Sequence, residues 1–114
     1  MSVNKYRAEK TLNLNGTDYT VRMGLDTCMR IESQLGCSIL KVGNMLASAD
    51  ISLQNVITIL HYALRGGGND IQEKDVKKIV SDIGLLESIK ACGEVITLAL
   101  NVDTGDEEED EKKP

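Results

Sequence analysis

The pair Asn15-Gly16 constrains this chain most, because Asn-Gly is the strongest short-range signal for a tight turn between two antiparallel strands. A type I′ turn needs a positive φ angle at both central residues, and Asn and Gly adopt it most readily. The turn sets the register by pairing Leu14 with Thr17. Counting outward gives one mainly apolar face, with the pairs Leu12/Tyr19, Lys10/Val21 and Ala8/Met23, and one polar face, with Asn13/Asp18, Thr11/Thr20 and Glu9/Arg22. We therefore predict a β-hairpin over residues 6–23 whose apolar face other elements must cover.

After the hairpin, the apolar residues recur with a period of about 3.6, which is typical of amphipathic helices. This period predicts helices over residues about 25–35, 38–48, 52–65, 72–83 and 86–101. Gly36 is placed to end the first helix in a left-handed conformation, and Ser38 and Ser52 are placed to cap the next two. Gly43 weakens the second helix, so we count four to five. The predicted fold class is α+β, an N-terminal antiparallel β-hairpin packed on a bundle of α-helices.

The predicted helices differ in how much of their circumference is apolar. Residues 52–65 are apolar over most of it, which is typical of a central helix, whereas residues 72–83 carry only a narrow stripe. Residues 86–101 carry a wide apolar arc, and either this helix is buried on both sides or part of the arc binds a partner. Leu25 and Leu53 belong to the apolar stripes of their helices, and Leu86 belongs to the wide arc. The candidate partner-binding residues on the wide arc are Val95, Leu98 and Val102.

Charge divides the chain into two parts. Residues 1–102 hold eleven acidic and eleven basic residues, whereas residues 103–114 hold seven acidic residues and two lysines. A neutral body without a basic stripe disfavours nucleic-acid binding. The last segment has almost no apolar residues and a block of like charge, so it cannot offset the entropy of ordering. We predict one domain over residues 1–102 and a disordered acidic tail over residues 103–114.

The residues that usually carry chemistry are few and scattered. His61 is the only histidine, and no Ser, Cys or carboxylate stands three or four residues away from it. The run Gly66–Gly68 follows a helix and lacks a phosphate-binding motif, so we interpret it as a helix stop and loop. Acidic residues 106–111 lack the spacing of a calcium loop. No C-x-x-C pair occurs among Cys28, Cys37 and Cys92. We predict no catalytic, cofactor or metal site, and therefore a protein that is not an enzyme.

The ends and the hydropathy of the chain carry no targeting signal. The first residues lack an apolar signal-peptide core, and no apolar run approaches the length of a membrane span. We expect a cytoplasmic protein that does not bind membranes.

Four short motifs follow one another in a recognisable order. They are Tyr19-x-Val-Arg22 after the hairpin turn, Ile31-Glu32, Leu35-Gly36-Cys-Ser-Ile39, and Ile59-Leu60-x-x-Ala-Leu-Arg-Gly-Gly67. Over about residues 8–100 the chain resembles the small tail proteins of phages, prophages and gene transfer agents, in the family of tail assembly chaperones encoded near the tape measure protein.

This resemblance implies a protein of virion assembly with protein partners and no cofactor. It implies binding to the tape measure protein in the host cytoplasm, and help for tail tube subunits that polymerise around it. Two alternatives stay open, namely a structural, tube-associated component of the particle and a general protein–protein interaction module. Self-association into a homo-oligomer also stays open.

Overall fold

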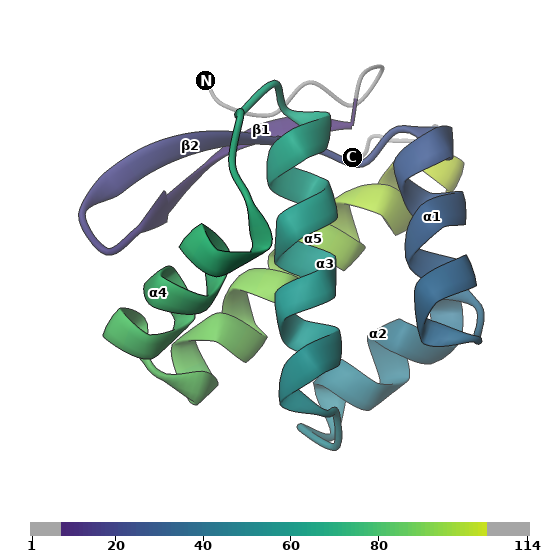
Figure 1. Ribbon diagram of the computed structural model, residues 1–114. Helices are drawn as coiled ribbons and strands as arrows, with labels where there is room; N and C mark the ends of the chain where they lie inside the picture. Colours follow the sequence, from purple (N-terminus) through teal and green to yellow (C-terminus); the bar gives the residue numbers. More distant parts are fainter. Residues whose placement is uncertain (1–7, 105–114) are drawn as a thin grey trace, which may run out of the picture.

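The computed structural model describes the backbone of residues 8–104 and the side chains of residues 8–100. In this part of the chain, a two-stranded antiparallel sheet precedes five helices, which confirms the predicted α+β class (Figure 1). The elements are β1 (Glu9–Leu14), β2 (Thr17–Arg22), α1 (Leu25–Leu35), α2 (Ile39–Ala47), α3 (Leu53–Gly66), α4 (Glu73–Ile83) and α5 (Leu85–Thr104).

The helix bounds agree with the predicted ones to within one residue, except at the end of α5. This helix continues to Thr104, so residues 103 and 104, which we had assigned to the disordered tail, have helical backbone. Once a helix is formed, each added residue gains a backbone hydrogen bond, and the helix can therefore extend beyond its apolar stripe. The rest of the predicted tail, residues 105–114, and the predicted hairpin residues 6 and 7 lie outside the described residues.

The hairpin has the predicted register, from Glu9 opposite Arg22 to Leu14 opposite Thr17. Asn15 and Gly16 have φ angles of 56° and 82°, as a type I′ turn requires. One face is buried, since the exposed fractions of Leu12, Leu14 and Val21 are 4%, 3% and 0%. The other face is exposed, and there Asn13 Nδ2 donates to Asp18 Oδ1 at 2.8 Å. The hairpin turn therefore determines which face meets the helices.

Helix α3 is the central element of the fold. It contacts β2, α1, α4 and α5, and Figure 1 shows it running through the middle of the molecule with α5 crossing behind it. Its inward residues have no exposed surface, namely Val56, Ile59, Leu60, Ala63 and Leu64. The prediction of a central helix over these residues is confirmed.

The sharp corner between α1 and α2 is held by backbone groups and one carboxylate. Gly36 has a φ angle of 74° and donates its N–H to Glu32 O at 2.8 Å. Ser38 caps α2 as predicted, because its Oγ accepts from Lys41 N. The side chain of Glu32 also takes part, because its Oε2 accepts a hydrogen bond from the Ile39 N–H at 2.8 Å. The motifs Ile31-Glu32 and Leu35-Gly36-Cys-Ser-Ile39 thus form one structural unit.

The C-terminal end of α3 lies directly on the backbone of β2. A Cβ atom on Gly66 would lie 2.6 Å from Arg22 O, and one on Gly67 would lie 2.0 Å from Thr20 O. Asn69 Nδ2 then donates to Thr20 O at 2.7 Å and to Leu64 O at 2.9 Å, which ties the loop after α3 to the strand. We had predicted only that these glycines end a helix. The structure shows that they also allow α3 and β2 to approach closely.

Three leucines that belong to the predicted apolar stripes or to the wide arc are exposed. Leu25, Leu53 and Leu86 have exposed fractions of 77%, 52% and 73%. Each belongs to the first turn of its helix and precedes the first buried residue of that helix. Helical period alone does not show where along a helix its neighbours begin.

We predict that Gly67→Ala destabilises the protein by about 1–3 kcal/mol, because the added methyl group overlaps Thr20 O. The φ angle of Gly67 is −82°, so alanine meets no conformational penalty there. The matched control is Gly93→Ala within α5, where a Cβ atom has no neighbour within 4 Å, and we expect it to stabilise by about 0.5–1 kcal/mol. Urea denaturation measures both. Equal stability of the two variants would contradict the close packing of α3 on β2.

Candidate partner-binding surface

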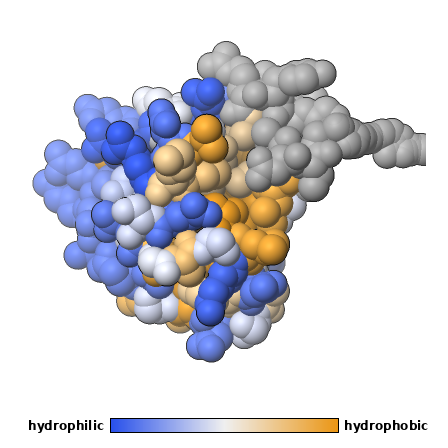
Figure 2. All heavy atoms as spheres, turned by 90° about the vertical axis from the view of Figure 1, so that its right-hand side faces the viewer, coloured by the Kyte–Doolittle hydropathy of each residue, from blue (hydrophilic) through white to orange (hydrophobic). Residues whose placement is uncertain are grey.

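An apolar groove lies between α2 and α5 and has a volume of about 690 Å³. Its apolar lining includes Leu40, Gly43, Ala47, Ile89, Ile96 and Leu100. Leu40 has an exposed fraction of 64% and stands at the edge. Figure 2 views the molecule from the side of α1 and α2 and shows hydrophobic surface gathered there. Exposed apolar surface of this kind is typical of sites that contact other proteins.

Two helix-interior glycines line this groove. A Cβ atom on Gly43 would meet Ile96 Cγ2 at 3.6 Å and Leu100 Cδ1 at 3.9 Å, so Gly43 lies at the contact between α2 and α5. A Cβ atom on Gly93 would meet nothing within 4 Å. The backbone of α5 is therefore accessible from the groove at Gly93. Our sequence reasoning treated Gly43 only as a weak point and passed over Gly93, although a glycine inside a helix is itself a signal of close approach.

The groove carries charge at its edges. Lys10 of β1 and Glu94 of α5 form an ion pair at 2.9 Å, with side-chain exposed fractions of 22% and 51%. Lys90 also lines the groove and makes only a long contact of 3.6 Å with the exposed Glu87. Lys41 of α2 lines a separate shallow hollow beside the groove, and the two share Leu40 and Asn44. Lys41 takes part in none of the ion pairs between described residues.

Two of the three predicted partner-binding residues, Val95 and Leu98, do not line the groove. Val95 is fully buried and Leu98 has an exposed fraction of 5%, so neither offers its side chain to a partner in this structure. Helix α5 contacts α2, α3 and α4, which accounts for the burial of Val95 and Leu98. The side chain of Val102 lies outside the described residues. The wide apolar arc of α5 reflects burial on several sides, and among the described residues it is open toward α2 and at its exposed first turn, Leu85 and Leu86.

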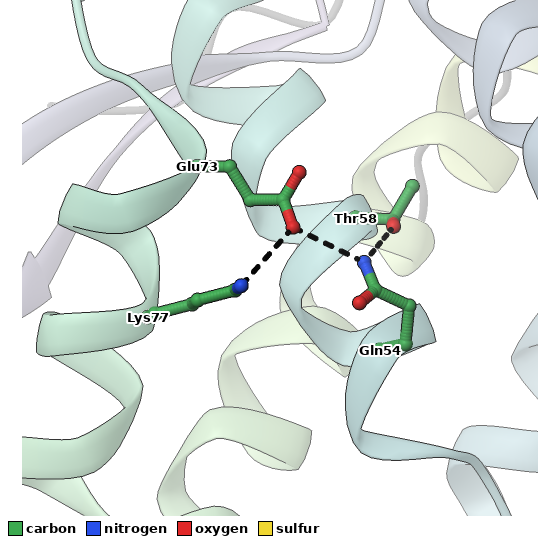
Figure 3. A network of polar contacts seen from close by, with 4 residues as sticks. All are labelled: Gln54, Thr58, Glu73 and Lys77. Atoms are coloured by element: carbon green, nitrogen blue, oxygen red, sulfur yellow. Dashed lines mark hydrogen bonds and ion pairs between the residues drawn. The ribbon is translucent and has the colours of Figure 1, made fainter.

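A second apolar hollow of about 580 Å³ lies where α3 and α4 meet the start of α5. Leu53, Ile57, Val80 and Leu85 line it. A polar network closes one side, in which Gln54 Nε2 bridges Thr58 Oγ1 at 3.3 Å and Glu73 Oε2 at 3.5 Å (Figure 3). Lys77 lies 3.7 Å from the same carboxylate. These contacts between exposed groups fix α3 against α4 and leave no cluster poised for catalysis.

The residues most capable of chemistry have structural roles. His61 Nε2 lies 3.1 Å from Ile71 O, an acceptor, so this nitrogen carries a proton and links α3 to the segment before α4. Cys92 is buried, its Sγ lies 3.5 Å from Val56 O, and burial raises the pKa of its thiol. The cysteines Cys28, Cys37 and Cys92 are free thiols.

The described residues contain neither a candidate metal cluster nor a candidate membrane-spanning helix. No group of three or more His, Cys, Asp or Glu side chains among them could hold a metal ion. None of the described helices combines the length and the apolar character that crossing a membrane requires.

The structure is that of a small α+β protein with an apolar groove between two of its helices. A comparison with protein families places it among phage tail proteins. The chain belongs to the family described as phage tail tube protein, GTA-gp10, whose model matches residues 7–102. Comparisons with curated proteins and with solved structures gave no match. The predicted relationship to tail proteins of phages and gene transfer agents is confirmed, and the family is one of structural phage tail proteins rather than of enzymes.

We predict that Leu98→Asp unfolds the protein or destabilises it by roughly 4 kcal/mol or more, because a charge replaces a buried side chain. The control is Leu40→Asp, where the exposed side chain predicts a change within about 0.5 kcal/mol. Circular dichroism during thermal unfolding measures both. A folded Leu98→Asp variant of normal stability would return Leu98 to the list of surface candidates.

We further predict that Cys92 does not react with a thiol reagent at pH 8 in the folded protein, because burial both shields the thiol and keeps it protonated. The partly exposed Cys37 serves as the internal control and should react under the same conditions. Peptide mapping by mass spectrometry before and after denaturation assigns the modified cysteines. Equal labelling of both cysteines in the folded protein would contradict the burial of Cys92.

Proposed function

We propose that this protein is a non-enzymatic tail assembly chaperone that binds the tape measure protein during tail morphogenesis. In this proposal it acts in the host cytoplasm, keeps the long helical tape measure protein from aggregating, and delivers it to tail tube subunits. Membership of a phage tail family supports the general role.

The single observation that best supports chaperone activity is the apolar groove between α2 and α5. Long helical proteins expose apolar stripes before they are assembled, and a groove between two helices suits such a stripe. The hairpin leaves little sheet with which to build a continuous β-structured tube, because the described residues contain only two strands. Both features favour transient binding to a helix over permanent incorporation.

The second candidate is a structural, tube-associated component of the particle. The description of the family favours it, since that description names the tail tube. A tube-associated component would remain in the finished particle in a fixed ratio to the tube, whereas a chaperone would be released.

We predict that co-expression with the tape measure protein of the same phage or gene transfer agent raises the soluble yield of the tape measure protein several-fold and gives a complex that survives purification. Quantitative mass spectrometry of purified particles should then find this chain absent or far below the level of the tube subunit. Stoichiometric amounts in the particle would favour the structural role, and failure to bind the tape measure protein would overturn the chaperone proposal.

A further inference from the structure

We propose that the groove between α2 and α5 binds an amphipathic helix whose apolar stripe is flanked by acidic residues. This inference rests on the proposed chaperone function for the identity of the partner, but its site and its chemistry follow from the groove. The groove offers an open floor at Gly93, apolar walls, and positive charge from Lys90 in its lining and from Lys41 in the neighbouring hollow.

The floor of the groove admits a helix at close range. Glycine within a helix is less stable than alanine by about 1 kcal/mol, and the fold has no need of it at position 93, because a Cβ atom there would meet nothing within 4 Å. Gly93 therefore leaves a site where the backbone or a side chain of a partner can lie against α5. The side chains around it, Leu40, Ala47, Ile96 and Leu100, are apolar and suit a row of apolar anchors spaced by helical turns.

The edges of the groove give the charge of the partner. The carboxylate of Glu94 pairs with Lys10 at 2.9 Å, and among the described residues it is the only acidic side chain that lines the groove. Lys90 of α5 then leaves positive charge in the groove, and Lys41 of α2 adds positive charge in the neighbouring hollow that shares Leu40 and Asn44 with it. The contact of Lys90 with Glu87 joins two exposed side chains, which makes it weak in water. A helix with acidic residues on both sides of its apolar stripe complements this arrangement.

The acidic tail of the chain is a poorer occupant of the groove. Residues 103–114 supply negative charge, but valine, leucine, isoleucine and aromatic residues are absent from them. Such a segment can pair with the lysines but leaves the apolar floor uncovered. An amphipathic helix can pair with the lysines and also cover the apolar floor.

The test measures binding of a synthetic amphipathic peptide of about 18 residues, which is five helical turns. Its apolar stripe is flanked by glutamates, and a matched peptide carries lysines in their place. Fluorescence anisotropy with the full-length protein should detect the acidic peptide, with at least about tenfold weaker binding of the basic peptide. Equal binding of both peptides, or of neither, overturns the proposal.

Variants of the protein locate the site. Gly93→Leu fills the floor and should weaken binding about tenfold or more, while its circular dichroism stays that of the folded protein. Lys41→Glu combined with Lys90→Glu changes only exposed side chains and should also weaken binding, with the greatest loss at low salt. The control Lys74→Glu makes the same charge change on α4, away from the groove, and should leave affinity unchanged. Equal loss in the control and in the groove variants overturns the site.

Two further outcomes assign the groove to another occupant and so overturn the proposal. Competition by a peptide of residues 103–114 would assign it to the tail of this chain, and a dimer that Gly93→Leu dissociates would assign it to a second copy. Binding of the tape measure protein separates this inference from the proposed function. If the groove variants bind it normally, the groove proposal fails and the chaperone role stands, whereas if the unaltered protein does not bind it but binds the acidic peptide, only the chaperone role fails.

Discussion

The contact between the end of α3 and the backbone of β2 determines how the rest of the structure is arranged. Gly66 and Gly67 bring the helix within reach of the carbonyl groups of Thr20 and Arg22, and Asn69 fixes the following loop to the same strand. Because no side chain separates helix and strand, α3 is held under the apolar face of the hairpin. The other helices then pack around α3, which contacts three of them.

This arrangement explains why α5 is apolar over so wide an arc. The helix contacts α2, α3 and α4, and these contacts bury many of its side chains, including Val95 and Leu98. Beyond its exposed first turn, the described part of α5 is open along the edge that faces α2, where the small residues Gly43, Ala47 and Gly93 leave a groove. The surface available to a partner is thus what the packing of α2 on α5 leaves uncovered.

The chemistry of the chain agrees with its place in a phage tail family. His61 and Cys92, which could serve catalysis elsewhere, here connect elements of the core, and burial raises the pKa of the Cys92 thiol. The polar network around Gln54 joins two helices through exposed groups. In the described residues these polar side chains connect elements that the buried apolar core already holds together.

The sequence by itself determined the hairpin, its register and the order of the helices. These features depend on local rules, namely the positive φ angles at Asn15 and Gly16, the caps at Ser38 and Ser52, and the helical period. The tertiary structure alone decided that Val95 and Leu98 are buried, that Leu25, Leu53 and Leu86 are exposed, and that the groove lies between α2 and α5. Helical period shows which residues share a face, but burial depends on which neighbour covers that face and how far along the helix it reaches.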